Sequence, residues 1–279
     1  MIMATLPLKP QVFAILSALI EERSGLHYEL SDMDMIADRL SARAVEAGFD
    51  SLLDYYYYLR YDDASKAELD ALLDALVVNE TYFFRELDSL KRMVSDFIEP
   101  LVASGKRPRV WCAACSTGEE PLTLAMLLAD RGHLAGVEIV ASDISGRALA
   151  RAQAGEFGPR SLRQLPLDGL GARFLVAMQD GRVRVREELV QAIRWRRVNL
   201  VEAEAVAALG AFDVISCRNV LIYFSDDTAR RVLASLTDAL QPGGALFVGV
   251  SESLLRFGSP LSCEERGGVF LYRKERKAS

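Results

Sequence analysis

Residues 110–124, V-W-C-A-A-C-S-T-G-E-E-P-L-T-L, predict a strand, a tight turn and a helix in succession. Val110–Ala114 are mostly apolar, as in a buried parallel strand, and Cys115–Gly118 are small and polar, as in a tight turn. Pro121 suits the first turn of a helix that continues through Ala129. This order of elements is typical of a doubly wound α/β sheet.

The next apolar run, Val137–Ser142, ends in Asp143, which stands 25 residues beyond Gly118. This spacing is close to the one at which a doubly wound fold places an acidic residue on a ribose. A dinucleotide fingerprint has three glycines, which let the backbone approach a pyrophosphate closely, and this turn has only one. The pattern therefore predicts a pocket for a nucleoside without phosphates, with S-adenosylmethionine (SAM) as the candidate ligand.

The 279 residues are 51% hydrophobic and 26% charged, which supplies a core for one large domain or two of ordinary size. No apolar run approaches the ~20 residues that span a bilayer, and residues 1–10 lack the features of a signal peptide. We therefore expect a cytoplasmic protein without membrane insertion. Four cysteines are too few for a disulfide framework, and a net charge of −6 argues against non-specific nucleic-acid binding.

Residues 1–95 predict a separate domain that is entirely helical. Apolar residues recur at helical spacing, without an alternating strand pattern, in the segments 11–23, 31–47, 51–59 and 66–78. In the second of these segments, Arg39 and Arg43 are one helical turn apart and share a side. They form either a solvated basic edge or a contact surface for an acidic partner.

The segment N-E-T-Y-F-F-R-E, residues 79–86, lies at the end of this domain. Aromatic clusters usually belong to a core, so its three aromatic residues are expected to be buried. Asn79, Thr81 and Arg85 are spaced two and four residues apart around them, which brings several hydrogen-bond donors to one side of a pocket. We interpret the segment as an aromatic plug that carries polar groups of a binding site.

Residues 96–279 continue the α/β pattern with one interruption. Phe157–Arg197 contain several glycines and prolines and short runs that alternate basic and apolar residues, which predicts a small antiparallel insertion. The sheet resumes at Arg194–Val198. This strand delivers Asn199 and Leu200 to its carboxyl end, where open α/β sheets bind ligands.

A further buried strand is predicted at Phe212–Cys217 and is followed at once by R-N-V-L-I-Y-F. Arg218, Asn219 and Tyr223 therefore lie at, or just beyond, the carboxyl end of that strand. In this architecture such positions belong to the ligand site.

The C-terminal part predicts two more strands. Q-P-G-G at 241–244 is typical of a turn and precedes a central strand at 245–250. Residues 269–272 predict a final edge strand.

Five segments occur in the same order as in CheR-type chemoreceptor glutamate methyltransferases, which this chain resembles over nearly its whole length. The segments are N-E-T-Y-F-F-R-E, C-S-T-G-E-E-P, A-S-D-I, C-R-N-V-L-I-Y-F, and P-G-G followed by S-E-S-L. The resemblance implies an all-helical N-terminal domain (1–95) and a Rossmann-like class I SAM methyltransferase domain (96–279). It also implies that the insertion at 157–197 is a small antiparallel β-subdomain.

The resemblance further implies a set of site residues. Arg85 and Tyr223 match family residues near the transferred methyl group, which makes them the catalytic candidates. Asp143 matches the ribose-binding acid. The positions that match the cofactor site are Asn79, Thr81, Arg85, Glu119, Glu120, Asp143, Asn199, Leu200, Arg218 and Asn219. Of the two adjacent glutamates, one or both match the acidic turn of the family.

The chain departs from the family pattern at two places. Cys112 and Cys115 replace residues that are more often serine or alanine, and Leu87–Leu90 lack the usual histidine and phenylalanine. A structural zinc would need a second ligand pair, which the remaining cysteines and the two histidines do not provide by their spacing. We therefore predict no metal and interpret Cys112 and Cys115 as small apolar core residues.

The implied reaction is methylation of glutamate carboxylates on the cytoplasmic domains of chemoreceptors, with glutamate methyl esters and S-adenosylhomocysteine (SAH) as products. A glutamate with a pKa near ~4.3 is ionised at neutral pH, so the reaction needs no general base. Arg39 and Arg43 are then the candidates for receptor docking, and we expect a monomer. The alternative is a SAM-binding module that docks on receptors and has little activity. An RNA or small-molecule methyltransferase is disfavoured by the whole-chain resemblance and the acidic net charge.

Overall fold

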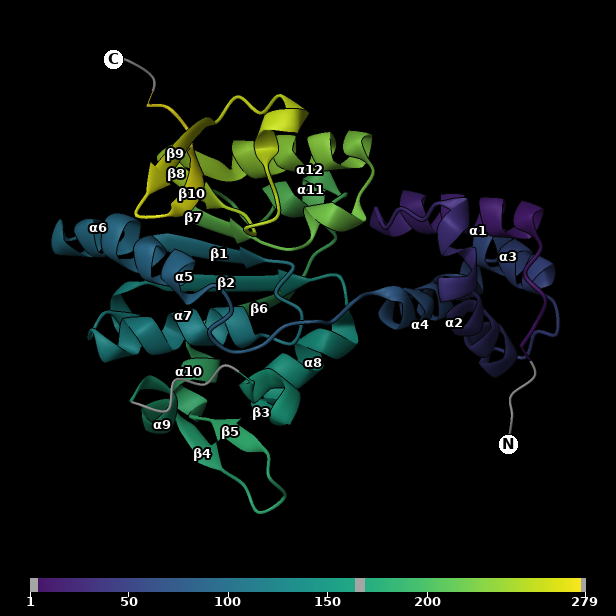
Figure 1. Cartoon of the computed structure of the whole chain (residues 1–279), viewed down its shortest axis with the longest axis horizontal. Helices are drawn as coiled ribbons and strands as arrows, with labels where there is room; N and C mark the ends of the chain where they lie inside the picture. The colour runs from purple at the N-terminus through teal and green to yellow at the C-terminus, as the bar shows by residue number, and fades with distance from the viewer. Residues whose placement is uncertain (1–4, 164–168, 277–279) are drawn as a thin grey trace. The chain divides into compact units, whose positions relative to one another are not determined.

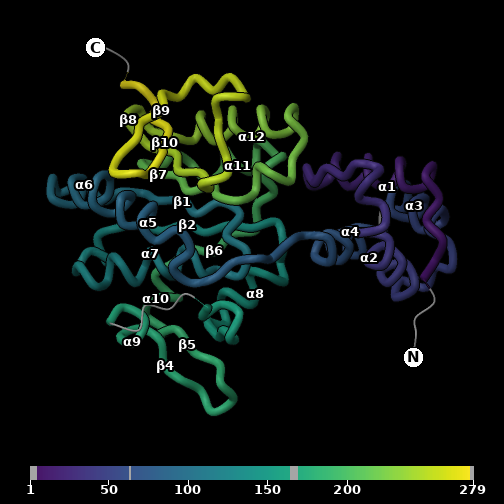
Figure 2. The backbone as a smooth tube through the Cα atoms, viewed as in Figure 1, coloured from purple at the N-terminus to yellow at the C-terminus, as the bar shows by residue number. Residues whose placement is uncertain are grey.

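The computed structural model describes residues 5–163 and 169–276, and the chain forms two compact units (Figures 1 and 2). The smaller, the helical unit, comprises Met1–Val78 with Tyr223–Ser225, and the larger, the sheet unit, comprises Asn79–Ile222 with Asp226–Ser279. The sequence predicts a domain boundary near residue 95. The division of the chain into independently folding domains stays a prediction. No helix within the described ranges is long and apolar enough to cross a membrane.

The helical unit is built from the helices that the apolar spacing predicts. They are α1 (Pro10–Ser24), α2 (Met33–Glu46), α3 (Leu52–Tyr61) and α4 (Lys66–Leu76), with the 3₁₀ turns η1 (Leu30–Asp32) and η2 (Asp63–Ser65). Helix α1 starts with Pro10, whose missing N–H is not needed there, and ends at Gly25, whose left-handed backbone (φ 80°) lets its N–H donate to the Glu21 carbonyl. Ser51 caps α3 by accepting a hydrogen bond from the Asp54 N–H at 3.3 Å.

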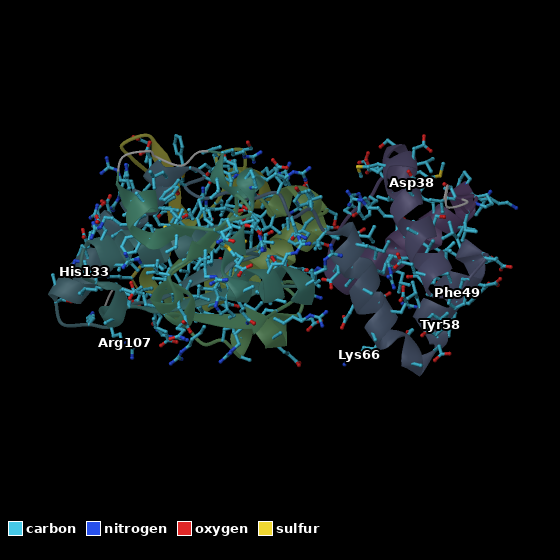
Figure 3. The ribbon with its side chains drawn as sticks, turned by 90° about the horizontal axis from the view of Figure 1, so that it is seen from below. Asp38, Phe49, Tyr58, Lys66, Arg107 and His133 are labelled. Atoms are coloured by element: carbon cyan, nitrogen blue, oxygen red, sulfur yellow. The ribbon has the colours of Figure 1, made fainter. Side chains whose placement is uncertain are left out.

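The core of the helical unit consists of side chains from every helix. Fully buried members are Leu16, Ile20, Ile36, Leu40, Tyr55, Leu72 and Leu76. Phe49, in the α2–α3 connection, lies against Tyr55 and Tyr58 with ring centroids 5.5 and 5.1 Å apart (Figure 3). Burial of each large aliphatic side chain contributes about 1.5–3 kcal/mol, so these contacts hold the helices of the unit together.

The sheet unit contains a seven-stranded sheet of order β6-β2-β1-β7-β8-β10-β9. Its strands are β1 (Arg109–Ala113), β2 (Glu138–Asp143), β6 (Ile193–Arg197), β7 (Phe212–Cys217), β8 (Leu240–Phe247), β9 (Ser262–Arg266) and β10 (Val269–Arg273). The first five in spatial order are parallel, and β10 is antiparallel to both of its neighbours. The strand order reverses at β1, which lies between β2 and β7, and such a reversal opens a crevice at the carboxyl ends of the strands.

Helices cover both faces of this sheet (Figure 1). On one face lie α5 (Leu87–Met93), the π-helical turn η3 (Val94–Ile98), α6 (Glu99–Ala103), α7 (Glu119–Asp130) and α8 (Gly146–Ala154). Val110 and Cys112 of β1 belong to the hydrophobic core on this side. Trp111, between them, points to the other face, where its indole N–H donates to the Ser142 hydroxyl at 2.9 Å. On that face α11 (Ala203–Ala207) packs against α12 (Asp226–Ala239).

Between β2 and β6 the chain forms a second, three-stranded antiparallel sheet, which confirms the predicted β-subdomain. Its order is β3-β5-β4, with β3 (Glu156–Phe157), β4 (Leu175–Ala177) and β5 (Val183–Val185). The connections contain η5 (Pro159–Leu162), α9 (Leu170–Phe174) and α10 (Glu187–Gln191). Residues 164–168 of the predicted insertion lie outside the described residues, and β6, at its end, belongs to the main sheet.

The C-terminal part differs from the prediction at two places. Strand β8 begins at Leu240, before the predicted turn, and the Q-P-G-G sequence is an irregular stretch within it: from the pair Phe212–Leu240 to the pair Val214–Ala245 the register with β7 shifts, and Gly243 adopts φ 82°. Gly244 allows the close approach, since a Cβ on it would lie 2.9 Å from the Asp213 carbonyl oxygen. Strand β10 is not an edge strand, because β9 pairs along its outer side. Strand β9 escaped detection because S-C-E-E-R lacks an apolar alternation.

Candidate functional site

The turn between β1 and α7, residues 114–118, has an unusual backbone. Ala114 and Ser116 both have φ 51°, and Gly118 has φ 92°. A Cβ on Gly118 would lie 2.7 Å from the Cβ of Ala152 and 3.0 Å from the Trp195 ring, so only glycine fits. Left-handed backbone at alanine and serine costs about 1–2 kcal/mol per residue, and surrounding contacts must hold the turn in this form.

Asp143, at the carboxyl end of β2, provides such contacts. One of its carboxylate oxygens accepts from the Ser116 N–H at 2.7 Å and the other from the Ser145 N–H at 2.9 Å, and the residue is 7% exposed. The Ser116 hydroxyl in turn donates to the side-chain oxygen of Asn79 at 3.0 Å. These two bonds tie the carboxyl end of β2 to the turn at residue 116 and to Ser145, the N-cap of α8.

Arg218, at the carboxyl end of β7, is the centre of a buried ion-pair network. Its Nη1 lies 2.7 Å from Glu120 and its Nη2 2.9 Å from Glu86, and Nη2 also donates to the Arg85 carbonyl at 3.1 Å. Its side chain is 2% exposed. Burial alone would lower the pKa of Arg218, but the two glutamates more than offset this and the net shift is upward.

One donor of this guanidinium has no partner. The Nε of Arg218 is buried and makes no hydrogen bond to any of the described residues. An unpaired buried donor costs about 1–3 kcal/mol, which a ligand with an acceptor group would recover. This orphaned donor fits SAM, whose methionine part carries a carboxylate.

Glu119 and Glu120 are adjacent in sequence but face different partners. Glu120 pairs with Arg218, whereas Glu119 accepts from the hydroxyls of Thr117 and Ser161, both at 2.7 Å. Glu119 is 1% exposed, and burial raises its pKa. On a helix, consecutive side chains point about 100° apart, so the two carboxylates serve different sides of the turn.

Two of the three aromatic residues of the 79–86 segment are core, as predicted, whereas Tyr82 is only partly buried. Phe83 and Phe84 are buried, and Phe83 lies edge-on to Phe157 with centroids 4.8 Å apart. The half-buried Arg85 folds back over its own segment, where its Nη1 donates to the Glu80 carbonyl at 3.0 Å. Thr81 is also partly buried. Arg85 therefore closes the loop that carries the polar groups.

Asn199 and Leu200 follow β6, and Asn219 follows β7, which β2 and β1 separate from β6 in the sheet. The Asn199 amide donates to Glu202 at 3.1 Å, and Leu200 is buried beside it. The Val198 N–H donates to the Asp143 carbonyl at 3.0 Å, which holds this loop next to the end of β2. Asn219 has a left-handed backbone with φ 58°.

The remaining candidates belong to the helical unit. The Tyr223 carbonyl accepts from the His27 N–H at 2.8 Å. Arg39 donates to the Leu76 carbonyl at 3.0 Å, and Arg43 forms ion pairs with Glu68 and Glu46. Both arginines thus have partners within their own unit, and their docking role stays a prediction.

Two acidic residues near the site were not among the predicted site residues. Glu86 pairs with Arg218, and Glu252, in the S-E-S-L segment, hydrogen-bonds the backbone of the loop after β7. Both lie inside segments that match the family, N-E-T-Y-F-F-R-E and S-E-S-L, and this was their only signal in the sequence. Cys112 and Cys115, by contrast, are buried core residues as predicted, and burial raises the pKa of both thiols.

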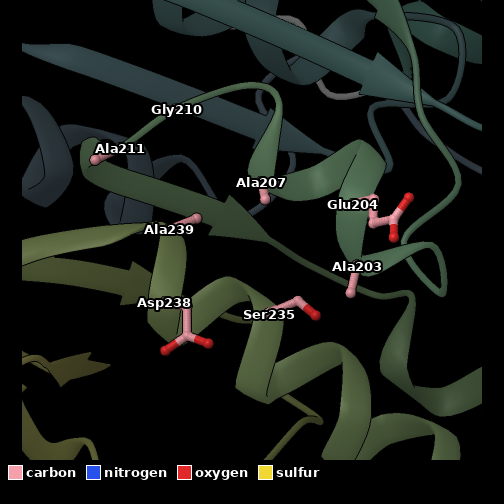
Figure 4. A pocket seen from close by; sticks show the side chains of 8 residues that line it. All are labelled: Ala203, Glu204, Ala207, Gly210, Ala211, Ser235, Asp238 and Ala239. Carbon is pink, nitrogen blue, oxygen red and sulfur yellow. The ribbon is translucent and has the colours of Figure 1, made fainter.

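A pocket of ≈ 530 Å³ lies elsewhere on the sheet unit, between α11 and α12 (Figure 4). Its lining consists of Ala203, Glu204, Ala207, Gly210, Ala211, Ser235, Asp238 and Ala239. Gly210 and Ala211 precede β7, so this pocket opens at the amino end of that strand. None of the predicted site residues lines it.

Comparison with known proteins covers both units. Residues 79–266 match the family described as CheR methyltransferase, SAM binding domain, and residues 11–77 match CheR methyltransferase, all-alpha domain. Chemotaxis protein methyltransferase 2 of Vibrio cholerae is 37% identical over 243 residues, which is 85% of this chain and 84% of that protein. Chemotaxis protein methyltransferase of Klebsiella aerogenes is 38% identical, over 89% of this chain and 85% of that protein.

Proposed function

Because this chain belongs to the CheR methyltransferase family, we propose that it transfers the methyl group of SAM to glutamate carboxylates of chemoreceptors. The products are a glutamate methyl ester and SAH. The observation that carries the proposal is the match of both domains, together with relatives named chemotaxis protein methyltransferases that align over more than four-fifths of this chain. The proposed partners are cytoplasmic domains of chemoreceptors, on which the chain acts as a monomer.

We assign the SAM site to the strand-end loops of the sheet unit, meaning residues 114–118, 143–145, 198–200 and 218–221. Asp143 accepts hydrogen bonds from the ribose hydroxyls, and Asn199 and Leu200 border the adenine. The unpaired Nε of Arg218 supports placing the methionine carboxylate beside it. Asn79 and Thr81 complete this end of the site, with Glu120 holding the Arg218 guanidinium in place.

The reaction requires orientation more than acid–base catalysis. SAM supplies an activated methyl group when bound, and the receptor glutamate is already a carboxylate at neutral pH. Holding the reacting groups in line is worth about 7–11 kcal/mol when the geometry is good. We assign this positioning to Arg85 and Tyr223. The bond from Arg85 to the Glu80 carbonyl fits a role in fixing the pocket wall, since a tight clamp on the carboxylate would stabilise the ground state.

The test is methyl transfer from methyl-labelled SAM to membranes that carry chemoreceptors. We expect label on the receptor band that is released as methanol in mild base, because methyl esters hydrolyse there and N-methyl groups do not. Receptors with their acceptor glutamates changed to alanine are the matched control and should stay unlabelled. Bound SAM without transferred label would instead favour the alternative, a receptor-docking module with little activity.

Arg85→Ala separates catalysis from folding in the same assay. We expect a loss of methylation rate with little change in melting temperature, since the half-buried side chain of Arg85 contacts neighbours in its own segment, which are the Glu80 carbonyl, Glu86 and the Tyr82 ring. Arg85→Lys is the control that keeps the charge. A collapse of the melting temperature with an unchanged rate per folded molecule would make Arg85 structural.

A further inference from the structure

A buried carboxylate stands next to the proposed SAM site without a role in it. Glu252 follows β8 and is 9% exposed. Its Oε2 accepts from the N–H groups of Asn219 at 2.7 Å and Gly249 at 2.8 Å, and its Oε1 accepts from the Leu221 N–H at 2.8 Å. Three backbone amides from two loops thus converge on one side chain, and each is a hydrogen bond to a charged acceptor.

Two of these bonds fix the backbone on either side of residue 220. Asn219 has φ 58°, a conformation that an asparagine tolerates but does not prefer. Holding the N–H groups of Asn219 and Leu221 on one carboxylate selects this conformation over the ordinary one. Because Arg218 is the preceding residue, the same two bonds set how the chain leaves β7 at the ion-pair network.

The third bond ties this loop to the end of β8. Gly249 approaches so closely that a Cβ on it would lie 2.5 Å from the Asn219 side-chain nitrogen and 2.9 Å from Glu252 Oε2. The Glu252 N–H also donates to the Gly249 carbonyl at 2.8 Å. The carboxylate is therefore held by its own loop while it holds the neighbouring one.

We propose that Glu252 is a positioning residue for SAM binding, which acts by holding Asn219 in its left-handed conformation and so presents Arg218 and Asn219 to the cofactor. The proposal rests on the SAM site assigned above. It requires a carboxylate, because two oxygens must accept from three donors and neither can be replaced by an N–H group. It does not depend on the identity of the methyl acceptor.

The test is SAM binding by calorimetry, without receptor, on the full chain carrying Glu252→Gln. The amide turns one acceptor oxygen into a donor that faces a backbone N–H, so at least one hydrogen bond to a charged acceptor is lost. We expect the SAM affinity of this variant to fall by about tenfold or more when it is measured well below the melting temperature. Among variants that bind, the Michaelis constant for receptor should stay unchanged, which separates this effect from receptor docking.

Tyr272→Phe is the matched control. The Tyr272 hydroxyl accepts from the Leu254 N–H at 3.0 Å, so this variant loosens the turn after Glu252 without touching Asn219. Its SAM affinity should match wild type within about twofold, the change expected when no site contact is lost. Equal losses in Glu252→Gln and Tyr272→Phe would overturn the proposal, because general loosening of the turn would then explain both.

Two further variants test the proposed route. Glycine adopts the left-handed backbone freely, so in an Asn219→Gly background Glu252→Gln should cost less SAM affinity than it does in wild type. Gly249→Ala, whose Cβ displaces the Asn219 side chain, should lower SAM affinity even if Glu252→Gln does not fold. Wild-type affinity in Glu252→Gln or in Gly249→Ala, or full additivity with Asn219→Gly, would overturn the proposal.

Discussion

Each unit contains an arginine held between two glutamates, and the two arginines differ in what they leave unpaired. In the helical unit Arg43 uses its Nε and Nη2 on Glu68 and its Nη1 on Glu46, and its side chain is 20% exposed. In the sheet unit Arg218 pairs with Glu120 and Glu86, is 2% exposed, and keeps a buried Nε without a partner among the described residues. Every guanidinium nitrogen of Arg43 thus has a partner within the fold, whereas the unpaired Nε of Arg218 leaves a donor that a ligand would satisfy.

The two units also differ in where non-glycine residues adopt a left-handed backbone. The described non-glycine residues with left-handed φ all lie in the sheet unit, at Phe84, Glu86, Ala114, Ser116 and Asn219. In the described part of the helical unit only glycines adopt such values, at Gly25 and Gly48. Strained backbone persists only where its surroundings impose it, and it concentrates at ligand sites. The strand-end loops thus contain both the strained residues Ala114, Ser116 and Asn219 and the unpaired donor of Arg218.

The largest expected effect is on the free energy of unfolding, and it differs between substitutions of Arg218 and of Arg43. Arg218→Met removes a side chain that is 2% exposed and leaves the mostly buried Glu86 and Glu120 without their cation, so it should lower the free energy of unfolding by about 3–5 kcal/mol. Arg43→Met removes a side chain that is itself 20% exposed, and one of its two partners, Glu46, is 56% exposed, so this variant should cost roughly 1–2 kcal/mol. Urea denaturation of both variants measures the difference. Equal losses would remove the contrast between a buried network at a site and a network that only supports the fold.

The next effect concerns SAM affinity. Asp143→Ala should weaken SAM binding by about 1.5–3 kcal/mol, because a charge-assisted contact to the ribose is lost and the Ser116 N–H loses its acceptor. Calorimetric titration provides the dissociation constant. Asp38→Ala, on an exposed position of α2, is the matched control and should bind SAM like wild type (Figure 3).

The sequence predicted the parallel strands well, because strands buried on both faces appear as continuous apolar runs, as Phe212–Cys217 does. It failed where the decisive contact is tertiary. The pairing of Glu86 with Arg218 joins residues far apart in the chain, and the two glycines of the Q-P-G-G segment exchange backbone hydrogen bonds with Lys274, near the end of the chain. Neither fact has a local signature.

The same distinction between local pattern and tertiary contact applies to the site residues. The carboxyl ends of predicted strands placed Asp143, Asn199 and Arg218 at one edge of the sheet, because parallel strands end together. The sequence did not distinguish Glu119 from Glu120, since adjacent carboxylates differ only in direction once the helix forms. Partners for Arg39 and Arg43 likewise became visible only when α4 was packed against α2.

A smaller effect is expected from Glu119 as pH changes. Its pKa in the folded protein is raised above the usual value of 4.5 by burial, so the protonated form is favoured on folding. The stability that this contributes is present below pH 4.5 and is lost as the pH rises through the folded pKa. Glu119→Gln should therefore gain melting temperature relative to wild type as the pH rises over that interval. If the difference in melting temperature between Glu119→Gln and wild type does not change with pH, burial of an ionisable carboxyl group at residue 119 is contradicted.

The smallest effect is expected at the proposed docking surface. Arg39→Glu with Arg43→Glu should raise the Michaelis constant for receptor at low salt and less at high salt, since exposed charges are screened. Glu68 and Glu46 already compensate Arg43, so Arg39→Glu alone should account for most of the change. Steady-state methylation at two salt concentrations measures it. Unchanged kinetics at low salt would exclude Arg39 and Arg43 from docking.

The most direct measurement is an experimental structure of the chain with bound SAH. We predict that the ribose hydroxyls lie within hydrogen-bonding distance of Asp143, with the adenine beside Leu200 and the carboxylate of the ligand on the free Nε of Arg218. SAH bound away from the strand-end loops, for example between α11 and α12, would contradict the assignment of the cofactor site.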